Sequence, residues 1–288
     1  VRSSVSAFDL MDLRKLKETN ERLGCNLTNA NLRYANLVHA NLTSVDLTDS
    51  NFTGVNLAGA NLTLSALDGA DLTGANLNGA NLTEAWLQDA NLTLARLKQT
   101  NFTNANLFSA NLTGVKLTDA NLTGASLAGV NLFASTLTNT KLTNLRGVKS
   151  GSIQGHPILP EPYLLANGYI LGPGVNLAGA EYLRSLNLTG ADLTSANLTE
   201  ANLSLTDLTD AKLTDADLTG ANLTGVKMTN ANLTRTTLTN AKLTKANLTN
   251  ARLSGAKLQG ANLTFAIMDG AILCNTTMPD GSVIYSAC

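Results

Sequence analysis

The chain has 288 residues, of which 44% are hydrophobic, only 4% are aromatic and 14% are charged, and its net charge is −1. A net charge this close to zero argues against a nucleic-acid partner and against a strongly acidic mimic. No apolar run approaches the roughly 20 residues that a membrane-spanning helix needs, so we expect no membrane span.

Residues 1–24 do not follow any repeat, and we expect them to form an N-terminal helical cap. Ser6, followed three residues later by Asp9, is typical of a capping box. Leucines then recur at helical spacing, at positions 10, 13 and 16. We expect a short amphipathic helix that covers the first coil of the structure that follows. The alternative is a helix that binds a partner.

A five-residue phrase, Ala-Asn-Leu-Thr-X, dominates residues 25–143 and 175–273. Leu or Phe occupies every fifth position from Leu27 to Leu142, and Leu or Met does so from Leu183 to Leu273. Five residues turn an α-helix by about 500°, so the leucines would form no stripe on it. The small residue and the Leu lie two apart and share one face of a strand. All the leucines therefore point inward only if the chain turns a corner once per phrase.

The phrase resembles the repeat of the pentapeptide-repeat family, as Ala30-Asn31-Leu32 and Ala70-Asp71-Leu72 illustrate. The resemblance implies an all-β solenoid, a right-handed quadrilateral β-helix with four repeats per coil. Residues 20 apart would then stack, with coils about 4.7–4.9 Å apart. The start of the chain is similar to the exported cyanobacterial members, in which a helix precedes the first repeat. Cys25 stands at a small inward position, where a buried thiol is expected.

Residues 144–174 interrupt the phrase and hold most of the prolines. Asn167-Gly168, flanked by apolar residues, predicts a hairpin between Tyr163 and Leu171, packed on the outside of the coil. The alternative is a recognition loop, since long ordered loops often carry function. Tyr163 and Tyr169 are then candidate surface contacts. Trp86 is a third candidate, because the only Trp stands at an outward position of the phrase.

Residues 274–288 lose the phrase and are expected to form a C-terminal cap. A Cys-x₁₃-Cys ending recurs in the family, and we expect Cys274 and Cys288 to form a disulfide that closes the cap. Disulfides persist in oxidising compartments. The first residue is Val1 rather than Met, although a trimmed chain would start in the same way. We therefore expect export to the periplasm or the thylakoid lumen.

Catalytic signatures are missing from the sequence, which has no G-x-S-x-G, no H-E-x-x-H and no phosphate-binding loop. Its two histidines, His39 and His156, suffice for no triad or metal site. We expect no enzyme, no cofactor, no metal and no small-molecule substrate. The predicted function is a structural or protein-interaction rod with an unidentified protein partner. The alternative is a DNA mimic that interacts with gyrase, as some members of the family do. The longest stretch with acidic but no basic residues runs only from Asp46 to Asp89, and basic coils follow.

Overall fold

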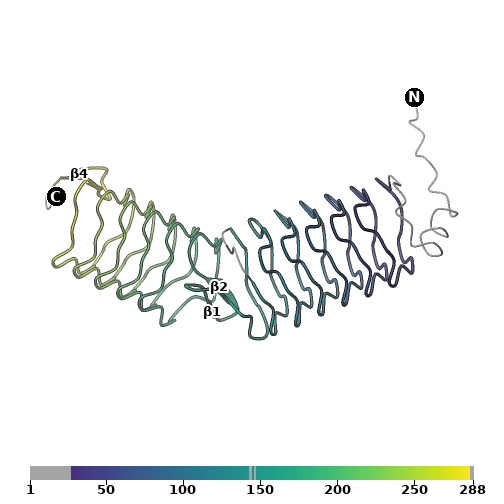
Figure 1. Ribbon diagram of the computed structural model, residues 1–288. Helices are drawn as coiled ribbons and strands as arrows, with labels where there is room; N and C mark the ends of the chain where they lie inside the picture. The colour runs from purple at the N-terminus through teal and green to yellow at the C-terminus, as the bar shows by residue number, and fades with distance from the viewer. Residues whose placement is uncertain (1–26, 143–144, 146, 286–288) are drawn as a thin grey trace, which may run out of the picture. The chain divides into compact units, whose positions relative to one another are not determined.

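The computed structural model describes residues 27–142, 145 and 147–285, and there the chain winds into flattened coils (Figure 1). Outward residues pair in parallel with the residue 20 positions later, as in Asn41 with Asn61 and Asn61 with Asn81. Four phrases therefore complete one coil, as predicted. Contacts divide the chain into two compact units. The first comprises Val1–Asn144 with Ser152–Leu159, and the second comprises Leu145–Gly151 with Pro160–Cys288.

Each phrase repeats one set of backbone hydrogen bonds, which the phrase around Leu62 illustrates. The Leu62 N–H donates to Asn81 O at 2.7 Å, and the Leu64 N–H donates to Thr83 O at 3.0 Å. The Ser65 N–H closes a turn onto Leu62 O at 3.1 Å. Leu64 has a φ of 58°, so the turn has a left-handed residue at its third position, where Gly and Asn are favoured. Because a corner follows every pairing residue, the coils consist of single bridges rather than long strands.

The Asn and Thr of the phrase hydrogen-bond the corner from outside. Asn61 Oδ1 accepts from the Thr63 N–H at 3.2 Å and from the Thr63 hydroxyl at 2.6 Å. Asn81 of the next coil donates its side-chain N–H to the same Thr63 hydroxyl at 3.0 Å. These bonds mimic a backbone turn and explain why Asn-Leu-Thr recurs in the sequence.

The inward positions form a narrow apolar core. Leu62, Leu82 and Phe102 stack in one column with 0% of their surface exposed, and the small inward Ala80 is equally buried. Buried hydroxyls are paired, as where Thr236 donates to Leu213 O at 2.8 Å. No buried side-chain nitrogen or oxygen of the described residues lacks a hydrogen-bond partner. The prediction that small and large apolar residues alternate inside the coil is confirmed.

A hairpin lies in the interruption, as predicted. Strands β1 (Leu164–Ala166) and β2 (Tyr169–Leu171) pair antiparallel, with Ala166 opposite Tyr169 across the Asn167-Gly168 turn. All three residues of β2 are buried, so this strand is closely packed, and the expectation that the hairpin lies on the outside of the coil stays a prediction. The Ile170 N–H donates to the Ser150 hydroxyl at 2.9 Å, which anchors β2 within the second unit.

The expected loop also contributes to the coils. Gln154 pairs with Thr136, and Ile158 pairs with Lys141, so this part of residues 144–174 continues the ladder of the first unit.

The C-terminal segment folds back on itself, with β3 (Thr276–Thr277) antiparallel to β4 (Val283–Ile284). Cys274 lies half-buried there and is not without a partner. Cys288 lies outside the described residues, so the disulfide stays a prediction. The expected N-terminal helix and Cys25 also lie outside them. Within the described ranges, no helix is long and apolar enough to cross a membrane.

Candidate functional site

A β-bulge breaks the ladder of the second unit just after the hairpin. The Asn202 N–H donates to Ala180 O at 2.8 Å, and the Ser185 N–H donates to Ser204 O at 3.0 Å. Two residues, Glu181 and Tyr182, therefore stand opposite the single residue Asn202. An extra residue of this kind disrupts pairing locally and redirects side chains, and it is common beside binding sites.

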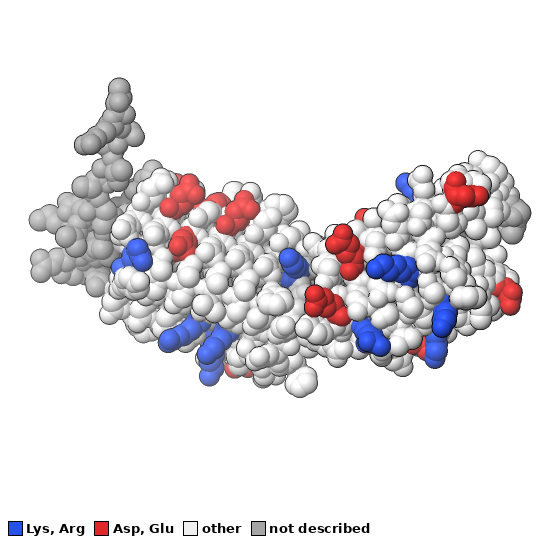
Figure 2. All heavy atoms as spheres, turned by 180° about the vertical axis from the view of Figure 1, so that it is seen from behind, with Lys and Arg blue, Asp and Glu red and all other residues white. Residues whose placement is uncertain are grey.

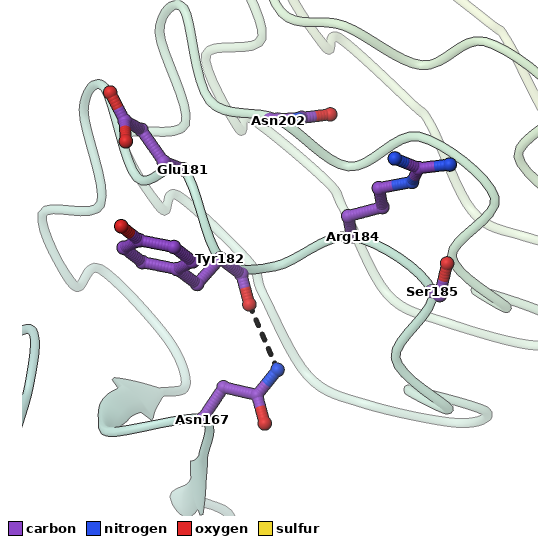
Figure 3. A pocket seen from close by; sticks show the side chains of 6 residues that line it. All are labelled: Asn167, Glu181, Tyr182, Arg184, Ser185 and Asn202. Atoms are coloured by element: carbon purple, nitrogen blue, oxygen red, sulfur yellow. Dashed lines mark hydrogen bonds between the residues drawn. The ribbon is translucent and has the colours of Figure 1, made fainter.

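The hairpin tip is tied to the bulge. Asn167, in the left-handed conformation with a φ of 46°, donates its side-chain N–H to Tyr182 O at 3.0 Å (Figure 3). Between the tip and the bulge lies an open cleft of about 570 Å³. The cleft is lined by Asn167, Glu181, Tyr182, Arg184, Ser185 and Asn202.

Asn202 is the first of two stacked Asn side chains, and its own NH₂ group has no partner among the described residues. Its Oδ1 accepts from the Ser204 N–H at 3.2 Å, from the Ser204 hydroxyl at 2.8 Å and from Asn222 Nδ2 at 3.3 Å. Some Asn amides donate to the Asn one coil earlier, as Asn76 does to Asn56 at 2.9 Å, whereas others, such as Asn232, only accept hydrogen bonds from their own turn. Opposite Asn202 that acceptor is replaced by the bulge. Its side-chain N–H groups are therefore left without a protein acceptor among the described residues.

Three ion pairs neutralise charge across neighbouring coils of the second unit, and none of them involves a residue of the cleft. Arg235 forms a two-pronged bond to Asp215, at 2.7 and 2.6 Å, across one coil. Lys212 with Asp192 and Lys227 with Asp207 repeat this arrangement at 3.7 and 3.4 Å. Acidic and basic side chains accordingly lie next to each other over the C-terminal part of the face drawn in Figure 2. Arg184 and Glu181 have no ion-pair partner within the described part of the chain, as is also the case for Arg252 of the same unit.

At Asp46 and Asp207, which replace the Asn of the phrase, hydrogen bonds from the following Thr lower the pKa of the carboxylate. Hydrogen bonds from the hydroxyl and then the N–H of Thr209 lower the pKa of Asp207 below its ordinary value. The hydroxyl and N–H of Thr48 do the same to the pKa of Asp46. These carboxylates stay ionised as turn acceptors, which is unsuited to proton transfer. Across the described ranges, no group of three or more His, Cys, Asp or Glu side chains is arranged to hold a metal.

The three aromatic residues singled out in the sequence differ in their exposure to solvent. Trp86 is 58% exposed on the first unit, so its outward position is confirmed and its role in contact stays a prediction. Tyr163 is half-buried and donates its hydroxyl to Pro173 O at 3.0 Å. Tyr169 is a wrong choice for a surface contact, because only 7% of it is exposed within β2.

The leucine spacing widens from five to six between Leu177 and Leu183, which indicates an extra residue, but the sequence analysis did not select the side chains around it. Tyr182 and Arg184 flank the inward Leu183, at positions where the following coils have Asn202 and Ser204. The sequence does contain a signal for them. When the coils are aligned 20 residues apart, Tyr182 and Arg184 differ from the residues at the same positions of the following coils. The hairpin tip could not be placed beside them, since that contact depends on how the interruption folds.

Comparison with known proteins identifies the repeat. The model of pentapeptide repeats matches in eight copies, at residues 25–63, 50–89, 60–107, 87–124, 110–144, 187–225, 216–255 and 256–280. No curated protein matches the chain.

Among solved structures, the chain is similar to HetL, a pentapeptide repeat protein involved in heterocyst differentiation regulation from Nostoc sp. strain PCC 7120. The two share 30% identity over 95% of this chain and 98% of HetL, with a TM-score of 0.37. Rfr23 from Cyanothece 51142 is 32% identical over 45% of this chain and 96% of its own, with a TM-score of 0.33. A pentapeptide repeat protein from the Arabidopsis thaliana thylakoid lumen is 26% identical over 35% of this chain and 71% of its own, with a TM-score of 0.28. The repeat matches and the identity to HetL show that the chain belongs to the pentapeptide-repeat family.

Proposed function

We propose that the protein is a non-enzymatic interaction module that presents the cleft between hairpin tip and bulge to a protein partner. The observation that carries this proposal is the gathering, at one place, of the departures from an otherwise regular surface. Most outward Asn and Thr side chains bond to their own turns. At the cleft, the unused donors of Arg184 and Asn202 lie together beside the bulge. Polar groups left available in a preformed cleft favour binding.

A gyrase-interacting DNA mimic is the alternative, and the charges of the second unit argue against it. Three of its acidic residues are paired with a base one coil later, so this unit does not present the continuous negative surface that a duplex mimic needs. A gyrase supercoiling assay with the purified chain separates the two functions. We expect no effect, and inhibition at low micromolar concentration would favour the mimic.

The compartment and the finer geometry of the fold are part of the same proposal. We place the protein in the periplasm or the thylakoid lumen, because the predicted disulfide of Cys274 with Cys288 needs an oxidising environment. We also propose that the coil is right-handed, as in the family that it belongs to.

The test of partner binding is site-specific photocross-linking in the cells that make the protein. Tyr182 is 65% exposed, and the photoreactive aromatic p-benzoylphenylalanine at this position keeps a ring in the cleft. We expect a discrete cross-linked protein that mass spectrometry identifies. The same substitution at Gln259, an exposed residue of the same unit outside the cleft, serves as the control. Equal labelling from both positions would argue against a site at the cleft.

A further inference from the structure

We infer that the cleft binds an isolated carboxylate on an extended segment of its partner, with Arg184 and Asn202 as the donors. The inference rests on the proposed function and specifies the chemistry of the bound group. Its basis is the set of donors that the bulge leaves without acceptors.

Arg184 supplies the charge. Its guanidinium carries several N–H donors in a planar fork that fits the two oxygens of a carboxylate. The same geometry operates inside this fold, where Arg235 holds Asp215 through two bonds at 2.7 and 2.6 Å. The side chain of Arg184 lines the cleft, but no carboxylate of the described residues pairs with it. A partner carboxylate would complete a contact that the unit makes internally elsewhere.

Asn202 adds a donor of defined direction. Its Oδ1 is held by Ser204 and Asn222, which fixes the amide plane and leaves the NH₂ group as the part of the side chain without a partner. The Asn202 NH₂ group is therefore a hydrogen-bond donor without an acceptor. Asn202 lines the same cleft as Arg184 (Figure 3). Donors from two adjacent coils favour an anionic acceptor over a cation or a neutral amide.

Glu181 and Tyr182 restrict which carboxylate fits. Glu181 and Arg184 extend away from each other in Figure 3 and line different parts of the cleft. A second partner carboxylate near Glu181 would be repelled, so an acidic run is disfavoured relative to a single Asp or Glu. The exposed ring of Tyr182 offers an apolar surface to the side chain next to that carboxylate. The bond from Asn167 to Tyr182 O, at 3.0 Å, holds this arrangement before a partner arrives.

The experiment is an NMR titration of the full chain with two matched peptides, acetyl-Ala-Glu-Leu-amide and acetyl-Ala-Gln-Leu-amide. We expect the Glu peptide to shift the side-chain signals of Arg184 and Asn202 in a saturable way, and the Gln peptide to bind at least about tenfold more weakly, since hydrogen bonds to charged groups are the stronger ones. Added salt should weaken the Glu peptide only. Arg184→Gln should abolish the difference between the peptides, and Arg184→Lys should keep part of it, because Lys retains the charge without the fork.

Arg252→Gln is the control, because Arg252 is an exposed arginine of the same unit that does not line the cleft. It changes net charge equally and should leave the titration unchanged. Equal shifts from the two peptides, or an equal loss with Arg252→Gln, would overturn the inference. A Tyr182 cross-link that forms although both peptides bind alike would keep the protein partner and reject the carboxylate.

Discussion

Removing one leucine from the middle of a core column should destabilise the first unit strongly. Leu82 is 0% exposed and lies between Leu62 and Phe102, which are equally buried. Leu82→Ala removes its buried apolar atoms and leaves a cavity, and such changes cost about 2.7–5.0 kcal/mol. Backbone hydrogen bonds hold each coil to the next at every phrase. The walls of the cavity therefore cannot collapse freely, and we expect a cost of about 4 kcal/mol.

The measurement is native-state amide hydrogen exchange combined with urea unfolding. Cooperativity can break down in a long repeat array, so the protection of individual amides is more informative than a single transition. We expect protection to fall in the coils that contain positions 62–102. Leu64→Ala is the matched control, because it removes the same atoms from a corner residue that is 50% exposed and should cost less than about 1 kcal/mol. A loss below about 1 kcal/mol for Leu82→Ala, or equal effects of the two changes, would refute the stacked-column account.

Three further predictions concern the surface and the ends. Hydrogen bonds lower the folded pKa of Asp46, so their contribution to stability is present at neutral pH and is lost as the pH falls below the usual value of about 3.9. Asp46→Asn, which keeps an acceptor, should flatten that part of the urea-midpoint profile between pH 7 and pH 2, and an unchanged profile would contradict this origin. Asn167→Gly keeps the turn but removes the 3.0 Å bond to Tyr182 O. It should increase amide exchange at the hairpin tip, whereas unchanged exchange would show that this bond does not restrain the tip. Non-reducing mass spectrometry should find Cys274 linked to Cys288, and two free thiols in protein from the native compartment would contradict the cap and the export proposal.

The period of the sequence was enough to predict the coil, for a physical reason. A corner every five residues allows a small residue and a large one to face inward at every phrase, and the burial of Ala80 and Leu82 agrees with this. The outward Asn and Thr were assigned to turns only by residue type. Their shared bonds, such as that from Asn81 to the Thr63 hydroxyl, depend on coils 20 residues apart being adjacent. That information follows from the number of corners, which the period itself does not contain.

The interruption was predicted less well, because its fold depends on contacts that are distant in sequence. The Asn167-Gly168 turn is local, and the hairpin was therefore predicted correctly. Ile170 is buried, and its N–H donates to the hydroxyl of Ser150, which is 20 residues earlier and outside any repeat. Likewise, the pairing of Gln154 with Thr136 has no signature in the phrase. The local pattern therefore predicts the hairpin but not which neighbouring residues pair with the coils.

A regular coil provides its own reference for identifying functional residues. Where the phrase is intact, the Asn side-chain oxygen and the Thr hydroxyl bond to the turn that they support. A departure from the phrase is informative if it brings unused donors together in one cleft. Trp86 differs from the residues 20 positions before and after it, but it adds only an exposed apolar surface. The bulge at Glu181 and Tyr182 does more, because it removes the acceptor of Asn202 and places Arg184 beside the vacated position. Two donors without acceptors and a tied hairpin tip, gathered in one cleft, are therefore stronger evidence for binding than exposure alone is.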